Sequence, residues 1–598
     1  MLNPSNRSLY TSALTSPPGM VFDEAIATSF SLDPAFLLQA PVYLAFTATD
    51  SNRAEDPLSI FEAIRRYSER ITVYVQKGRI QVLAKLKPNP LFGLLEEMIV
   101  ESKAKGHGVF HPKIWAIRFI NPETDEAMYR LVVLSRNLTT DSSWDLSLQL
   151  DGYPAKRKQS ANKALVYLFS VLPKRAMGKM AKHRRTQAQR FSDELLYVEW
   201  ECPAGFDEAA FFLPGEGYDW QPPEADRAVV ISPFCTDEAL QHIVKHCQQA
   251  DALISRPETL LTLSEETRSL FTRQLHLDDA AEEQASDGST PDDIIASGLH
   301  AKAYLFENGR DSELVLGSAN ATSAALLGKT NCEILVSLKG KKKHTGTIDD
   351  LLSSDGMESY LQDFDPAQPF EPDVLRVEAG SHVEQARALL AEAELTLHCH
   401  PGGNDQSWAL WLVGETPELP GIVQATAWPV TVSDGLGCSL LDPADGNKRA
   451  LGEFSVPAIT GLTAFSLKTS HPDVSVRFVL NLPIDTLPPD RHAMILQSSM
   501  QKQDFLRYLL MLIGEAGQQS FFAENSFGDG RFFTGLASGE EFAVLEELTR
   551  IYSREPEHLK DIAALIGNMR KGQSDMIPQD FLALWAVFES AMGGRNGR

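Results

Sequence analysis

The sequence lacks several features that would assign it to a class at once. Its 598 residues contain 6 cysteines with no Cys-x-x-Cys pair, which argues against a zinc ribbon or a disulfide framework and indicates reduced thiols. Residues 1–20 lack the apolar segment of a secretory signal, and no run reaches the roughly 18 apolar residues of a membrane span. We therefore expect a cytoplasmic protein without a metal or other cofactor.

Positive charge is also scarce. With 55 Lys and Arg against 80 Asp and Glu, the formal net charge is -25, which argues against a protein that coats nucleic acid non-specifically. Residues 156–190 are the exception, because they contain no acidic residue. This segment predicts either a solvated pair of basic helices or an electrostatic track for a polyanion. The residues expected to bind nucleic acid there are Lys156, Arg157, Lys158, Lys174, Arg175, Lys182, Arg184 and Arg185.

Hydrophobic patterning predicts an α/β fold in the first part of the chain. Short apolar runs of strand length alternate with segments of helical periodicity, and the alternation restarts near residue 228. Beyond residue 366 the pattern changes to short strands separated by Gly, Pro and Asp turns, which is typical of a β-sandwich or small barrel, and then to helices. We expect domains at 1–195, 196–365, 366–485 and 486–598. The expected strands include 41–46 and 71–75, then 395–399, 408–413, 422–431, 462–468 and 474–481; expected helices include 91–102, 236–249, 382–394 and four segments after residue 501.

A His-x-Lys pattern with a downstream Asn occurs twice. His111 and Lys113 are followed by Asn137, which comes after an apolar run. Since side chains alternate along an extended segment, the His and the Lys point to the same side. The second copy contains His300, Lys302 and Asn320 in the same order. A single His-x-Lys pair is common in strands, but two copies of the longer pattern predict one divided active site.

These residue types suit attack on a phosphodiester. Histidine is a nucleophile and a proton donor near neutral pH, while lysine and asparagine hold the non-bridging oxygens whose charge must be stabilised in the transition state. One histidine can form a phosphohistidine while the other protonates the leaving oxygen and later removes a proton from water. Such a scheme requires no metal.

The two copies resemble the motifs of the phospholipase D superfamily. The second copy is nearly complete, since Ser318 and Glu333 also match, and the first is similar to the variant of the tyrosyl-DNA phosphodiesterase branch, with Ser135 in the equivalent place. The resemblance covers roughly residues 20–350 and implies two similar α/β lobes about a pseudo-twofold axis, with both half-sites at their interface. A monomer then holds a complete site.

The family analogy also assigns roles. It implies His111 as the nucleophile and His300 as the general acid and base, an assignment that the motifs alone leave reversible. We expect Glu333 to support His300 or a neighbouring lysine by a hydrogen bond. Trp144 is either a core residue or a stacking surface for a base. The pattern departs from the family where an aspartate is usual, because Arg118 and Glu307 stand five residues after the lysines.

The function that we expect is a metal-independent phosphodiesterase or nuclease. Its resemblance to bacterial phospholipase D-like proteins implies a component of a DNA restriction or anti-phage defence system, working beside a helicase or another partner. The alternatives are a phospholipase D or transphosphatidylase acting on lipid, and a catalytically idle nucleic-acid-binding scaffold. The sequence leaves open DNA or RNA, single or double strands, and ends or internal bonds.

Overall fold

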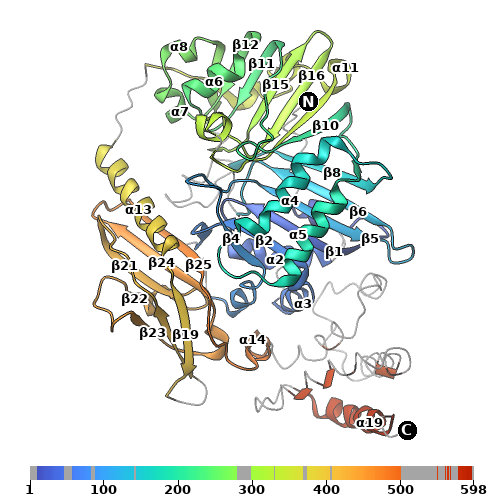
Figure 1. Cartoon of the computed structure of the whole chain (residues 1–598), viewed down its shortest axis with the longest axis vertical. Helices are drawn as coiled ribbons and strands as arrows, with labels where there is room; N and C mark the ends of the chain where they lie inside the picture. The colour runs from blue at the N-terminus through green and yellow to red at the C-terminus, as the bar shows by residue number, and fades with distance from the viewer. Residues whose placement is uncertain are drawn as a thin grey trace.

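The computed structural model consists of two large mixed sheets and a smaller β-rich part (Figure 1). It describes residues 10–45, 57–82, 88–139, 143–278, 298–328, 330–367, 373–403, 407–499 and 577–595, together with positions 509, 548–549, 552, 559, 562–563 and 566–567.

The first sheet contains seven strands in the order β4-β2-β1-β5-β6-β8-β9. Strands β5 and β6 are buried along almost their whole length, as is typical of a sheet covered on both faces. Helices α4 and α5 lie across it in Figure 1. The strands are β1 (Val21–Ser29), β2 (Ile71–Gln76), β4 (Ile99–Ser102), β5 (Ile114–Ile120), β6 (Ala127–Leu134), β8 (Ser147–Pro154) and β9 (Val198–Trp200); the helices are α1 (Tyr10–Leu14), α2 (Pro34–Ala45), α3 (Pro57–Tyr67), α4 (Lys163–Arg175) and α5 (Lys182–Leu195).

The second sheet contains eight strands in the order β10-β17-β16-β15-β11-β12-β13-β18. Its strands are β10 (Phe206–Phe212), β11 (Ala225–Ile231), β12 (Cys247–Ile254), β13 (Phe271–Leu277), β15 (Ala303–Asn308), β16 (Asp311–Gly317), β17 (Leu335–Lys341) and β18 (Leu361–Asp363). Its helices are α6 (Asp237–Val244), α7 (Pro257–Thr262), α8 (Glu265–Arg268), α11 (Lys342–Thr345) and α12 (Ile348–Leu351).

The two sheets repeat one topology. Read from β4 and from β13, each begins with three parallel strands and continues through four antiparallel ones, and the second sheet adds β18 at its edge. One hydrophobic core contains side chains from both sheets, including Ile114 and Leu131 from the first and Val229 and Leu305 from the second. One face of each sheet therefore packs into a shared core.

The β-rich part is joined to the first sheet by hydrogen bonds. It contains a three-stranded sheet, β19-β20-β23, and a five-stranded sheet, β22-β21-β24-β25-β3, in which β3 (Ile80–Gln81) comes from the N-terminal part of the chain. Both sheets and helix α13 (Val374–Glu392) share one core. The other elements are β19 (Thr396–Pro401), β20 (Ser407–Val413), β21 (Ile422–Pro429), β22 (Cys438–Ser439), β23 (Lys448–Ser455), β24 (Leu462–Thr469), β25 (Ser475–Asn481), α14 (Arg491–Ser499) and α19 (Gln579–Arg595).

The α/β character of the first part is confirmed, and the five strands expected between 395 and 481 all exist. The strand expected at 41–46 is wrong, because residues 34–45 form α2. Asp33 Oδ1 accepts the Ala35 N–H at 2.8 Å and so starts that helix, whose apolar residues are buried on several sides and show no helical period.

Two other expected helices are also corrected. The helix expected at 91–102 is a 3₁₀ turn, Pro90–Leu94, followed by β4, and the helix expected at 236–249 ends at Val244, where the chain turns into β12. In both cases the apolar residues of a strand continue the spacing of the preceding turn, so that the boundary is not visible in the sequence. Of the four C-terminal helical segments, 581–591 lies in α19, while 505–513, 542–551 and 559–566 lie almost entirely outside the described residues.

Candidate active site

His111 is held by backbone pairing with the other half of the chain. It lies in the extended segment before β5, where its amide donates to the Cys332 carbonyl at 2.9 Å and the Cys332 amide donates to the Val109 carbonyl at 2.9 Å. The approach is so close that a Cβ atom on Gly108 would lie 1.7 Å from the carbonyl oxygen of Thr330. Only glycine fits there.

His300 is held by the reciprocal arrangement. The short strand β14 (Gly298–Leu299) pairs in parallel with β7 (Ser143–Trp144) of the first half. The amides of His300 and Ala301 both donate to the Trp144 carbonyl, at 2.9 and 2.8 Å. Each histidine segment is thus bound to the backbone of the opposite half.

At His111, side chains of the two halves also contact each other. Its Nδ1 lies 2.7 Å from Glu333 Oε2, and Glu333 is only 1% exposed. Ser318 donates its hydroxyl to the same carboxylate oxygen at 2.5 Å, and Asn331 Nδ2 donates to Oε1 at 3.3 Å. Since a carboxylate accepts, the ring proton belongs on Nδ1, and Nε2 keeps its lone pair. Our expectation that Glu333 supports His300 or a neighbouring lysine by a hydrogen bond is wrong, because the crossing of the halves directs its carboxylate to His111.

Asp145 occupies the corresponding position beside His300, and the sequence analysis missed it. His300 Nδ1 lies 3.7 Å from Asp145 Oδ1, beyond hydrogen-bond distance, and Ser135 donates its hydroxyl to that oxygen at 3.0 Å. The signal was an acidic residue downstream of the first Ser-x-Asn, as Glu333 is downstream of the second. Thus Ser135 and Ser318 both bind the acid that faces the histidine of the opposite half.

Both motif lysines are buried among these groups. Lys113 is 1% exposed, and its Nζ lies 2.7 Å from His111 Nε2. Lys302 is 2% exposed, and its Nζ donates to the carbonyls of His300 at 2.7 Å and Ser135 at 3.4 Å. Burial lowers the pKa of Lys302 to about 8. Burial, followed by the charge of Lys302, also holds the pKa of Lys113 well below its usual range.

The two histidines are neutral near pH 7 for the same reasons. Burial lowers the pKa of His111 to about 4, although the Glu333 carboxylate acts in the opposite direction. Burial, followed by the charges of Lys302, Lys113 and Arg256, lowers the pKa of His300 to about 2. The contacts His111–Glu333 and Lys302–Ser135 join the two half-sites, and the two buried lysines make the place favourable for negative charge.

The asparagines follow equivalent strands but have different surroundings. Asn137 comes after β6, and its Oδ1 accepts the Ser31 amide at 3.4 Å. Asn320 comes after β16, and its Oδ1 is buried without a hydrogen-bond partner in the part of the chain that the structure describes. Both are partly buried.

The residues that replace the family aspartates are structural. Arg118 bonds to Tyr129 Oη at 3.0 Å and pairs with Glu194 at 3.1 Å and with Asp23. Glu307 is 2% exposed and accepts the Ile348 amide at 2.6 Å. Both lie toward the far ends of β5 and β15, away from the histidines.

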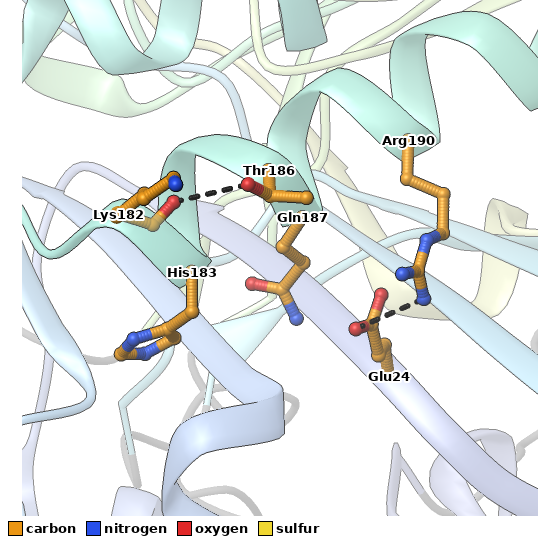
Figure 2. Close-up of a pocket in the computed structure, with 6 residues that line it drawn as sticks. All are labelled: Glu24, Lys182, His183, Thr186, Gln187 and Arg190. Atoms are coloured by element: carbon orange, nitrogen blue, oxygen red, sulfur yellow. Dashed lines mark hydrogen bonds and ion pairs between the residues drawn. The ribbon is translucent and has the colours of Figure 1, made fainter.

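The basic segment is less uniform than the sequence indicates. Arg184 is 4% exposed and donates to the Ile71 and Ser68 carbonyls, so it supports the fold rather than an exposed surface. Arg175 pairs with the buried Glu216. Lys182 lines an open pocket of about 520 Å³ beside Arg190, which turns toward Glu24 at 3.2 Å (Figure 2). The residues of the predicted set that are exposed are Lys156, Arg157, Lys158, Lys174, Lys182 and Arg185.

These exposed residues lie at different distances from the histidines. Strand β8 starts beside Ser135 and ends at Pro154, about 25 Å away at 3.3 Å per residue, so 156–158 lies at the opposite end of the sheet.

Trp144 packs on Tyr360 with ring centroids 5.1 Å apart, which makes it largely a packing residue. Among the described residues, no group of three or more His, Cys, Asp or Glu is placed to hold a metal ion, and no helix is long and apolar enough to cross a membrane.

Comparison with known proteins finds similarity in fold alone. No protein-family model matches the sequence, and no curated protein matches it. The solved structures that match include yeast tyrosyl-DNA phosphodiesterase (10% identity, 56% of this chain and 85% of that chain, TM-score 0.33). They also include phosphatidylserine synthase of Haemophilus influenzae (10%, 64% and 91%, TM-score 0.33) and polyphosphate kinase of Porphyromonas gingivalis (12%, 63% and 50%, TM-score 0.31). With such TM-scores, these similarities carry no argument about the substrate or residue roles of this chain.

Proposed function

We propose that this chain is a metal-independent phosphodiesterase that cleaves nucleic acid through a phosphohistidine. His111 is the nucleophile and His300 is the general acid and base. Lys113, Lys302, Asn137 and Asn320 bind the non-bridging oxygens. The observation that carries the proposal is the convergence of the two motifs: Glu333 of the second half lies 2.7 Å from His111, and the buried Lys302 donates to the Ser135 carbonyl of the first half at 3.4 Å.

The different support of the two histidines favours His111 as the nucleophile. Its Nδ1 hydrogen bond to Glu333 at 2.7 Å fixes the ring and stabilises the positive charge that develops when Nε2 attacks. His300 Nδ1 lies 3.7 Å from Asp145 and has no such bond among the described residues.

An entering phosphodiester activates both groups. Its charged oxygens accept hydrogen bonds from the Lys113 ammonium group. Without substrate, Lys113 Nζ lies 2.7 Å from His111 Nε2, so this change of partner frees the Nε2 lone pair for attack. The same negative charge offsets the lysines and raises the pKa of His300, so that His300 can carry the proton that it donates. Nε2 then forms a bond to phosphorus as the bond to the leaving oxygen breaks, and the leaving oxygen takes the His300 proton.

The second step regenerates the enzyme. Water attacks phosphorus and gives its proton to His300, and the bond between Nε2 and phosphorus breaks. Lysine and asparagine side chains hold the oxygens throughout, in a buried site where their charge and dipoles act strongly.

For the substrate we propose nucleic acid, with DNA favoured over RNA. The exposed Lys174, Lys182 and Arg185 support this, because an extended polyanion benefits from positive charge outside the reacting centre. We propose the two sheets as two phospholipase D-like lobes related by a pseudo-twofold axis, bounded at 1–195 and 196–365. The repeated strand order supports this division.

The remaining assignments have less support and follow the resemblance. We propose 366–485 as a β-sandwich-like accessory domain and 486–598 as a helical domain. The chain would work in the cytoplasm as part of a DNA restriction or anti-phage defence system, with a helicase or another protein as its partner. A monomer contains both motifs and is sufficient for the reaction.

One assay tests the function directly. Purified protein is incubated in EDTA with single- and double-stranded DNA, RNA and phospholipid vesicles. We expect cleavage of a nucleic acid, lost in both His111→Ala and His300→Ala. Lipid turnover alone would contradict the nuclease, and binding of nucleic acid without cleavage, independent of both histidines, would indicate a scaffold.

The assignment of the histidines has its own test. His300→Ala slows hydrolysis of the phosphohistidine, so a protein–DNA adduct that survives denaturation should accumulate in that variant and not in His111→Ala. The opposite pattern would reverse the two roles.

A further inference from the structure

An aromatic residue on the His300 side of the site is unusually exposed. Phe234 follows strand β11, which ends at Ile231, and is 46% exposed although it is a large apolar side chain. Its backbone is nevertheless fixed. The Phe234 carbonyl accepts from the Ser232 hydroxyl at 2.7 Å, and the Pro233 carbonyl accepts from Thr259 at 2.8 Å. The ring is therefore presented to solvent by a rigid loop.

Arg256 connects this ring to the candidate active site. Its guanidinium carbon lies 5.3 Å from the centre of the Phe234 ring, in the geometry of a cation–π contact. Its Nε donates to the Leu299 carbonyl at 3.0 Å, immediately before His300. The charge of Arg256 is also one of those that depress the pKa of His300, after burial and the two lysines. The Phe234–Arg256 pair thus lies beside the reacting centre.

The first sheet also has an aromatic–arginine pair, but at a different position. Phe30 comes one residue after β1, whereas Phe234 comes three residues after β11, and the Arg79 guanidinium lies 4.7 Å from the Phe30 ring centre. This pair is partly buried: the Phe30 ring packs 5.2 Å from the His111 ring, and Arg79 donates to Glu384 of helix α13 at 2.7 Å. One pair is built into the support of the nucleophile, while the other is open.

We propose that Phe234 and Arg256 form a stacking platform for a nucleobase on the His300 side of the scissile phosphate. An exposed aromatic ring stacks a base of any sequence, and an arginine plane adds a second stacking surface and a positive charge for the backbone. The inference rests on the proposed nucleic-acid substrate and deepens it. It requires a nucleotide with a base on that side of the cleaved bond.

The experiment removes the platform and the base separately. After the cleaved bond has been mapped, kcat and KM are measured on single-stranded DNA and on strands with an abasic site at each position flanking that bond. Phe234→Ala should lose roughly tenfold or more in kcat/KM on the intact strand and almost nothing on one of the abasic strands. Phe234→Tyr should retain activity. Tyr153→Ala is a matched control, since Tyr153 is 48% exposed at the far end of β8.

Two results would overturn the platform while leaving the phosphodiesterase intact. They are an unchanged kcat/KM in Phe234→Ala, and an equal loss on intact and abasic strands. If wild-type protein cleaves no nucleic acid, the proposed function fails. A measurement of nucleic-acid binding then tests the stacking platform independently of cleavage. Strands carrying 2-aminopurine should show stacking-dependent quenching on binding that Phe234→Ala loses and Tyr153→Ala keeps, and quenching that persists in Phe234→Ala rules the platform out.

Discussion

His111 and Glu333, 222 positions apart in the chain, are joined by a hydrogen bond of 2.7 Å between Nδ1 and Oε2. The bond links the histidine of one motif to the acid of the other. It fixes the tautomer in which Nε2 keeps its lone pair, and it places negative charge behind the ring. The pairing thereby distinguishes His111 from His300.

Replacing this acid should change the pH profile as well as the rate. In Glu333→Gln the charge that stabilises the His111 cation is lost, and kcat should fall roughly 100-fold or more. Since the Glu333 carboxylate raises the pKa of His111 against the effect of burial, neutralising Glu333 should move the acid limb of kcat/KM to lower pH than in wild type. Glu313→Gln is the control, because Glu313 pairs with Lys339 at 3.5 Å away from the site. An unshifted limb in Glu333→Gln would contradict the role.

Acid should destabilise the protein through the two histidines. Their folded pKa values, about 4 for His111 and about 2 for His300, lie below the ordinary 6.5. Between pH 6.5 and 4 the unfolded chain therefore binds more protons, and stability is lost as pH falls. The slope is up to about 1.4 kcal/mol per pH unit for each histidine. Urea unfolding at several pH values should show a flatter slope for a His111→Gln, His300→Gln double variant than for wild type; equal slopes would refute the shifts.

The buried charge of Lys302 should lower the stability of the protein, although the proposed reaction requires it. It is 2% exposed, and its pKa is lowered to about 8 from 10.5. Lys302→Met should abolish cleavage yet raise the free energy of unfolding at pH 7 by roughly 1–3 kcal/mol. Between pH 8 and 10.5 the unfolded wild-type chain binds more protons than the folded one, so wild-type stability rises with pH. The stability advantage of Lys302→Met over wild type should therefore shrink in that range. The exposed Lys343→Met should change little, and a destabilised Lys302→Met would count against the argument.

Gly108 should be intolerant of a side chain. In Gly108→Ala the added Cβ would lie 1.7 Å from the Thr330 carbonyl oxygen, so the segment that carries His111 must move. We expect a loss of roughly 1–3 kcal/mol and a lower kcat. Gly380→Ala is the matched control: nothing lies within 4 Å of its Cβ position, and in helix α13 the change should stabilise by about 0.5–1 kcal/mol. Thermal unfolding and kcat of both variants provide the comparison.

The residues of the candidate site could be predicted from the sequence, but their partners could not. His111, Lys113, His300 and Lys302 form local patterns, and contacts between the halves bring the two pairs together. The pairing of Glu333 depends on how the halves dock, and no spacing within one half contains that information. Asp145 follows the first Ser-x-Asn as Glu333 follows the second, but the sequence does not show that it faces His300 of the opposite half.

Burial produced two of the other errors. The apolar run from Pro41 was expected to form a strand, because a helix buried on several sides shows no helical period. Arg184 was expected on a basic surface, because composition does not reveal that its guanidinium donates to the Ile71 and Ser68 carbonyls. The expected strands of the β-rich part were found, because Gly and Pro turns separate short apolar runs there.

The crossed segments at 109–111 and 298–301 make each half depend on the other for the position of its histidine. When the first half has left the ribosome, His111 has neither Glu333 nor the backbone of Cys332 to hold it, and when the second half folds alone, His300 lacks the Trp144 carbonyl. A nascent, truncated or misdocked chain therefore contains His111 and His300 without the contacts that position them. We expect two separately expressed halves to be inert and to gain the proposed activity only on mixing, because the candidate site is complete only after the two halves have docked.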